Sequence, residues 1–144
     1  MPSRIGAFDN EITGYLGFCA VKFVGYSIAA RVISRFFYPN VTRGAFTIGG
    51  ARTLIGMISG AGYYGLYQAK GAMMLGYGPQ SYWAGLFPVR FLEWCFLIWL
   101  FYDRKFENKP KFCRVALLGT AWSYVCDIPA VIGYFMTGGV FVIC

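Results

Sequence analysis

Residues 44–67, GAFTIGGARTLIGMISGAGYYGLY, form an apolar stretch that holds one arginine among several glycines. A helix rises about 1.5 Å per residue, so this stretch is long enough to cross a bilayer. Arg52, Gly56 and Gly60 recur every four residues and share one helical face, with Gly49 close by. Because glycine has no side chain, a second helix can approach this face closely. We therefore expect Gly49, Gly56 and Gly60 to be helix-packing residues.

The composition of the whole chain indicates a membrane protein. Of its 144 residues, 58% are hydrophobic and only 13% are charged, whereas about a quarter of the residues in soluble domains are charged. The length fits a single transmembrane domain, residues 1–144, with short links between about four spanning helices. The sequence thus predicts an all-α, polytopic transmembrane bundle of four helices. The predicted spans are residues 12–33, 44–67, 82–102 and 115–137.

Several functional classes are excluded or disfavoured by composition. The chain has no histidine, which removes the commonest general base and metal ligand. Its five cysteines include no CxxC pair, so neither a structural zinc site nor thiol-redox chemistry is expected. The basic residues are spread over loops and helix ends and form no stripe, which argues against nucleic acid as a partner. We expect no catalytic residues, no metal and no cofactor.

Five ionisable residues lie near the middle of the four predicted spans. They are Lys22, Arg52, Arg90, Glu93 and Asp127. Each such charge costs about 2.5 to 3.5 kcal/mol at the centre of a bilayer, so we expect these side chains to face one another or water. Arg90 and Glu93 are three residues apart and can meet on one helix, which leaves Asp127 as the partner of Arg52 or Lys22. Three cations and two carboxylates leave one positive charge, which an anion, a lipid phosphate or deprotonation of Lys22 would neutralise.

Two functions are compatible with this charged cluster. In the first, the protein transports or binds a small anionic or polar substrate at mid-membrane, and all five residues belong to the substrate-binding site. In the second, the protein is a non-catalytic accessory or assembly subunit, the charges are interhelical salt bridges, and the glycine face docks a partner helix. A membrane enzyme that uses Asp127 or Glu93 has no supporting motif. Either way we expect the lipid bilayer as a partner and a homo-oligomer or larger membrane complex.

The sequence leaves open where some helices begin and where they kink. Pro88 lies early in the third span and should kink it or mark its true start, in which case Arg90 would move toward the interface. Pro129 is expected to kink the last helix. Arg4 precedes an apolar run, as in a signal peptide, but Lys22 interrupts that run and favours a span.

The loops predict an orientation in the membrane. With four spans, the first and third links share one side, and both termini share the other side with the second link. The second side carries only Arg4 and Lys70. Cytoplasmic loops are enriched in lysine and arginine, so both termini are predicted to lie on the non-cytoplasmic side of an integral membrane protein. The basic residues on the first side are Arg31, Arg35, Arg43, Arg104, Lys105, Lys109, Lys111 and Arg114.

Overall fold

The structure, a computed structural model, describes residues 4–73 and 79–136. Within these ranges the chain forms four helices and no strand, which confirms the all-α class for the described part. Each predicted span lies largely within one helix. The helices are α1 (Arg4–Phe36), α2 (Ala45–Met73), α3 (Pro79–Phe101) and α4 (Lys109–Met136).

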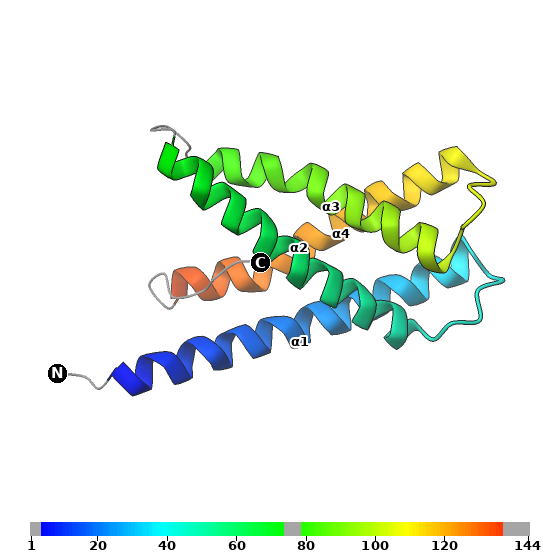
Figure 1. Ribbon diagram of the computed structural model, residues 1–144. Coiled ribbons are helices and arrows are strands. Elements are labelled where there is room, and N and C mark those ends of the chain that lie inside the picture. Colours follow the sequence, from blue (N-terminus) through cyan, green and yellow to red (C-terminus); the bar gives the residue numbers. More distant parts are fainter. Residues whose placement is uncertain (1–3, 74–78, 137–144) are drawn as a thin grey trace.

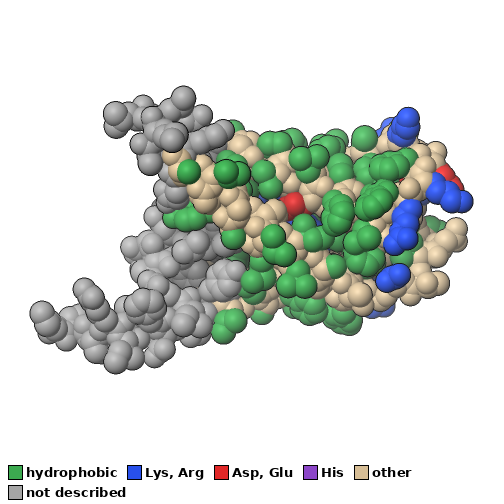
Figure 2. All heavy atoms as spheres, in the orientation of Figure 1, with side chains coloured by type: hydrophobic (Ala, Val, Ile, Leu, Met, Phe, Trp, Pro, Cys, Tyr) green, Lys and Arg blue, Asp and Glu red, His purple; other side chains and the backbone are tan. Residues whose placement is uncertain are grey.

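The four helices form two hairpins, α1–α2 and α3–α4 (Figure 1). Helices α1 and α3 each pack against both α2 and α4, so α1 and α3 occupy diagonal positions in the bundle. The link after α1 and the link after α3 lie at the same end of the bundle, and lysines and arginines gather there on the surface (Figures 1 and 2). We call residues 31–44 and 101–114 the basic end.

Local hydrogen bonds define how α3 ends and how α4 begins. The backbone N–H groups of Tyr102 and Asp103 both donate to the carbonyl oxygen of Ile98, at 2.8 and 2.9 Å. Asn108 Oδ1 accepts a hydrogen bond from the backbone N–H of Lys111 at 3.0 Å, which is the usual geometry of an N-cap. These bonds keep the link short and make α3 and α4 antiparallel neighbours.

The two prolines lie within helices. Helix α3 begins at Pro79 and continues through Pro88, so the alternative in which the helix starts at Pro88 is wrong. Arg90 consequently stays in the interior, where it is 4% exposed. Helix α4 continues through Pro129 to Met136.

The bundle has a hydrophobic core around Trp94, Leu97 and Ile98, but apolar side chains also cover much of its outer surface. Figure 2 shows apolar side chains over the middle of the surface and cations at the basic end. The interior also contains many polar groups. The buried polar and charged residues are Ser27, Arg52, Thr53, Arg90, Glu93, Asp103, Thr120, Ser123 and Asp127.

Two of the four helices are apolar enough, by length and composition, to cross a membrane: α1 over Leu16–Phe36 and α3 over Ala84–Phe101. This suggests an association with membranes. Helices α2 and α4, which carry Arg52 and Asp127, are not among these candidate spans.

Gly49 lies where the backbones of α1 and α2 come closest. A Cβ atom there would be 2.7 Å from Ser27 N and 2.8 Å from Ser27 Cα. Since backbone atoms cannot move aside, we expect Gly49→Ala to lower the free energy of unfolding by about 1 to 3 kcal/mol. Thermal unfolding in detergent measures the effect. Gly62→Ala is the matched control, because no atom lies within 4 Å of a Cβ at Gly62; equal stability of the two variants would contradict the prediction.

Candidate functional site

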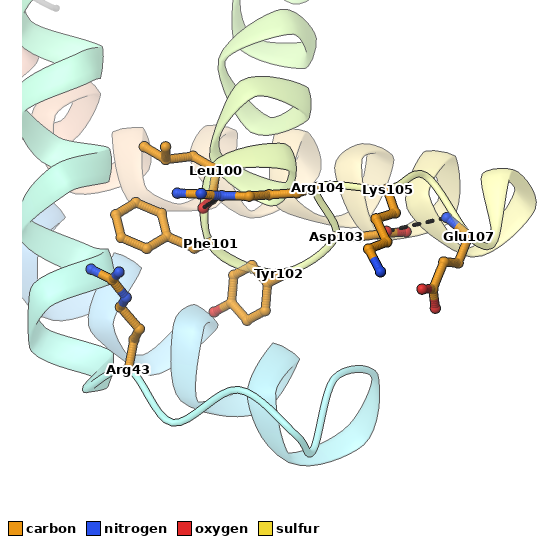
Figure 3. A pocket seen from close by; sticks show the side chains of 8 residues that line it. All are labelled: Arg43, Leu100, Phe101, Tyr102, Asp103, Arg104, Lys105 and Glu107. Carbon is orange, nitrogen blue, oxygen red and sulfur yellow. Dashed lines mark hydrogen bonds between the residues drawn. The ribbon is translucent and has the colours of Figure 1, made fainter.

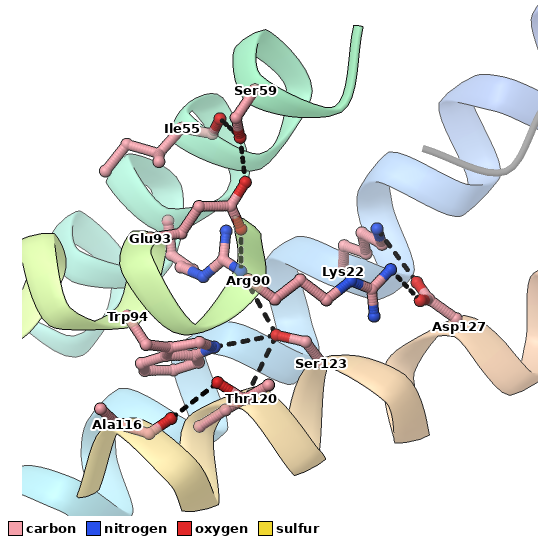
Figure 4. A network of polar contacts seen from close by, with 12 residues as sticks. Lys22, Ile55, Ser59, Arg90, Glu93, Trp94, Ala116, Thr120, Ser123 and Asp127 are labelled. Atoms are coloured by element: carbon pink, nitrogen blue, oxygen red, sulfur yellow. Dashed lines mark hydrogen bonds and ion pairs between the residues drawn. The ribbon is translucent and has the colours of Figure 1, made fainter. Parts of the chain in front are cut away.

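The five charged residues expected at mid-span form ion pairs inside the bundle, and Figure 4 labels four of them, Lys22, Arg90, Glu93 and Asp127. Lys22 comes from α1, Arg52 from α2, Arg90 and Glu93 from α3, and Asp127 from α4. We call these five residues the ionic network. Arg52 and Asp127 are each only 1% exposed, and the Lys22 side chain, the most accessible of the five, is 12% exposed.

One half of the ionic network is built around the Glu93 carboxylate. Arg52 Nη2 lies 2.6 Å from Glu93 Oε2, and the Ser59 hydroxyl donates a hydrogen bond to Glu93 Oε1. Ser59 Oγ also lies 2.6 Å from the carbonyl oxygen of Ile55, one turn earlier. Both oxygens of the Glu93 carboxylate on α3 are therefore paired with groups of α2.

The other half is built around the Asp127 carboxylate. Lys22 Nζ lies 3.0 Å from Asp127 Oδ1, and Arg90 Nη2 forms an ion pair with Asp127 Oδ2. Asp127 thus ties α4 to both α1 and α3. Of the two partners expected for Asp127, Lys22 pairs with it and Arg52 does not. Glu93 pairs with Arg52 of the neighbouring helix rather than with Arg90.

The Arg52 guanidinium group sits between aromatic rings and a serine of α4. Its Nη2 donates to Ser123 Oγ at 3.3 Å, and Ser123 Oγ also accepts from Trp94 Nε1 at 2.9 Å. The guanidinium carbon lies 4.8 Å from the centre of the Tyr26 ring and 5.3 Å from that of Trp94. Since aromatic faces attract cations, these rings stabilise part of the buried charge.

The ionic network carries one positive charge in excess, since it holds three cations and two carboxylates. The Arg90 guanidinium carbon lies 4.4 Å from the centre of the Tyr124 ring, and the Lys22 ammonium group lies 4.5 Å from that of Phe18. Within the described residues, Arg52 Nε, Arg52 Nη1 and Arg90 Nη1 are buried donors without a hydrogen-bond partner. Buried unpaired donors of this kind are costly.

A small cavity lies beside the ionic network, between α1 and α2. Its volume is about 10 Å³, which is close to the minimum needed for one water molecule. In this conformation the cavity therefore has no room for a substrate larger than a water molecule. It is lined by Phe18, Cys19, Lys22, Tyr26, Thr53, Gly56 and Met57.

The glycines of α2 differ in what they contact. Gly49 faces the α1 backbone, whereas a Cβ atom at Gly56 would be 2.9 Å from Arg52 Nη1 of its own helix. Gly56 therefore makes room for the guanidinium group of its own helix, and its helix-packing role stays a prediction. Gly60 is buried, and its packing role stays a prediction.

Sequence reasoning did not single out Ser59 or the contacts of Ser123 and Trp94. Ser59 lies seven residues after Arg52, which is two helical turns on the same face. Ser123 lies four residues before Asp127. A search for small hydroxyl residues one or two turns from a mid-span charge would have found both serines.

The larger cavities lie at the basic end. One, of about 390 Å³, is lined by Arg43, Arg104 and Lys105 together with the carboxylates of Asp103 and Glu107. Figure 3 shows the mixed charges around it, with Arg104 Nε donating to the carbonyl oxygen of Leu100 at 3.3 Å. The mixture of both signs gives this cavity no clear preference for anions.

Tyr38 belongs to a neighbouring cavity at the same end. Burial, together with the nearby Asp103 carboxylate, raises the pKa of the Tyr38 hydroxyl above its ordinary value. The Lys111 ammonium group lies 4.2 Å from the centre of the Tyr38 ring. At neutral pH this tyrosine is uncharged and serves as an aromatic contact for the lysine.

Comparison of the chain with models of protein families, with curated proteins and with solved structures finds no match. Any statement about function therefore depends on the chemistry of the chain itself. Among the described residues, no three His, Cys, Asp or Glu side chains are grouped so that they could hold a metal ion.

Proposed function

We propose that this chain is an integral membrane protein whose four helices all cross the bilayer. The support is that large apolar side chains are exposed on all four helices while Arg52, Arg90, Glu93 and Asp127 are buried, because a bilayer solvates apolar surface and excludes charge. Apolar side chains are exposed also on α2 and α4, which are not among the two candidate spans. Examples are Leu54 and Ile58 on α2, which are 61% and 75% exposed, and Leu118 and Ile128 on α4, which are 57% and 52% exposed.

The proposed orientation follows from the cations at the basic end. Lysine and arginine accumulate in short cytoplasmic loops. The basic end accordingly lies in the cytoplasm, and both termini lie on the other side of the membrane.

Within the membrane, we propose that the protein is a non-catalytic accessory or assembly subunit, and that the ionic network holds its helices in register. One observation carries this proposal: the carboxylates of Glu93 and Asp127 are each paired with a cation from another helix, and the cavity beside them is only about 10 Å³. Glu93 and Asp127 are thus engaged in ion pairs rather than open to a substrate. Buried polar groups that fix the register of helices are a known use of such pairs.

A second candidate function, the binding or transport of a small anion, is favoured by a different observation. The ionic network has one excess cation, and Arg52 carries two buried nitrogens without a hydrogen-bond partner in the described part of the chain. An anion of about the size of a water molecule would satisfy these groups.

Thermal unfolding of the purified protein in different sodium salts distinguishes the two functions. A ligand that binds only the folded state at 100 times its Kd adds about 2.7 kcal/mol to stability. The subunit proposal predicts that Tm in chloride, nitrate, phosphate and gluconate at equal ionic strength follows only their general effect on protein hydration, with phosphate raising Tm and nitrate lowering it. A Tm that rises in chloride or nitrate but not in gluconate, together with chloride flux into liposomes containing the protein, would overturn it in favour of the anion site.

A further inference from the structure

We propose that the seam between α1 and α4 binds one phospholipid with an anionic headgroup. Its acyl chain would occupy an apolar groove of about 230 Å³ on the outside of the bundle. The proposal rests on membrane residence, but not on the role of the ionic network. The groove is lined by Ile28, Ala29, Val32, Ile33, Phe37, Val115, Leu118, Gly119 and Trp122.

The floor of the groove is shaped by a glycine. A Cβ atom at Gly119 would be 2.5 Å from Trp94 Cε3 and 2.6 Å from Trp94 Cε2. The indole ring is fully buried and is held by its hydrogen bond to Ser123. The groove therefore has a rigid, close-packed floor.

The dimensions of the groove suit a hydrocarbon chain. The lining residues of α1 run from Ile28 to Ile33, about 8 Å at 1.5 Å per residue, and Phe37 follows directly after the helix. A molecule of liquid water takes about 30 Å³, so the groove holds several methylene groups. Since no polar side chain lines it, neither water nor a polar ligand would be satisfied there.

Two arginines, Arg35 and Arg114, lie where the groove reaches the basic end. Arg35 lies three residues after Val32 and seven after Ile28, and Arg114 lies four residues before Leu118. These spacings place each arginine on the helical face that lines the groove. Both arginines are exposed. An amphiphile with its chain in the groove would thus bring its phosphate to the level of two guanidinium groups, which bind phosphate well.

A neighbouring cavity shows why the phosphate belongs at the arginines and not deeper. Phe37 lines both the groove and a cavity of about 270 Å³ that contains Lys111. Asp103 and Glu107 also line that cavity, and they would repel an anion. The phosphate therefore lies on the outer side, near Arg35 and Arg114.

Native mass spectrometry of the detergent-purified protein with added lipid tests the proposal. We expect phosphatidylglycerol to stay bound and phosphatidylcholine to bind more weakly. Arg35→Gln with Arg114→Gln should weaken phosphatidylglycerol binding by about 30-fold, since each cation near an anionic surface contributes a factor of about five. Arg43→Gln with Arg104→Gln removes the same charge from the other side of the basic end and should leave binding unchanged.

A second pair of variants tests the groove itself. Val32→Trp should block binding of both lipids because the indole fills the groove. Val24→Trp is the control, since Val24 is exposed on the same helix but does not line the groove. Both positions are exposed, so neither variant is expected to unfold the protein.

Four results would overturn the proposal. The first is equal binding of the two lipids, and the second is that Val32→Trp binds lipid as the wild type does. The third is that inorganic phosphate alone displaces the lipid at concentrations similar to those at which the lipid binds. The fourth is that the wild-type protein is a dimer and Val32→Trp dissociates it. The last result would assign the groove to a second copy of the chain. Extraction of native membranes with alkaline carbonate tests membrane residence separately, so failure of the lipid site and failure of the membrane proposal are distinguishable.

Discussion

Asp127→Asn is expected to destabilise the protein more than any other single substitution of similar size. The aspartate is 1% exposed and pairs with both Lys22 and Arg90. Without its charge, two buried cations lose their counter-ion, and breaking a buried pair in this way costs about 3 to 5 kcal/mol. A fluorescence-monitored thermal unfolding experiment in detergent should show a large drop in Tm or no folded protein.

The control for this prediction is Glu107→Gln, which removes a carboxylate that is exposed at the basic end. Surface changes of this kind are usually within about 0.5 kcal/mol. Equal Tm values for the two variants would mean that Asp127 is not the centre of a buried pair. Adding Lys22→Met and Arg90→Met to an Asp127→Leu chain should restore much of the stability, because a well-packed apolar set can replace a buried ionic one.

Arg52→Gln is expected to have the second largest effect. It removes the partner of Glu93 and the contact with Ser123, and it leaves the carboxylate with the Ser59 hydroxyl. We expect a loss of about 3 kcal/mol or more. In contrast, the double variant Arg52→Met with Glu93→Met leaves no unpaired charge and should recover most of the stability.

These two Arg52 variants also separate the two candidate functions. If the pair only holds α2 against α3, the double variant regains its Tm and the protein keeps its partners in the membrane. If Arg52 binds an anion, Arg52→Gln stays folded and loses any chloride-dependent rise in Tm. A double variant that is as unstable as the single one would contradict both descriptions of the Arg52–Glu93 pair.

The convergence of the charges could be predicted from sequence because lipid excludes charge from the outer faces of the helices. The individual pairs could not. Arg90 and Glu93 are close along α3, but they lie about 60° apart around its axis, so Glu93 faces α2 while Arg90 reaches Asp127 on α4. Which neighbour each residue meets depends on the vertical offset of the helices, and the sequence does not encode that offset in any local pattern.

The helix boundaries show a similar limit. The span over residues 12–33 was predicted from the length of apolar chain that a bilayer needs, whereas α1 begins at Arg4. A helix does not have to end where the hydrocarbon ends, since polar residues can continue it in water. Likewise, the spacing of Arg52 and Gly56 predicted a shared face correctly, but it could not reveal that the arginine side chain itself would occupy the space above Gly56.

The division of the ionic network between the two hairpins has a consequence for the biogenesis of the protein. The first hairpin contributes Lys22 and Arg52, two cations without a carboxylate, and the second contributes Arg90, Glu93 and Asp127, with a net charge of −1. If all four helices cross the membrane as proposed, the first hairpin has no internal counter-ion for its charges while the second half is still being synthesised. On that proposal it waits at the insertion machinery or near the membrane surface until α3 and α4 arrive, and a chain truncated after α2 is expected to be removed by membrane quality control.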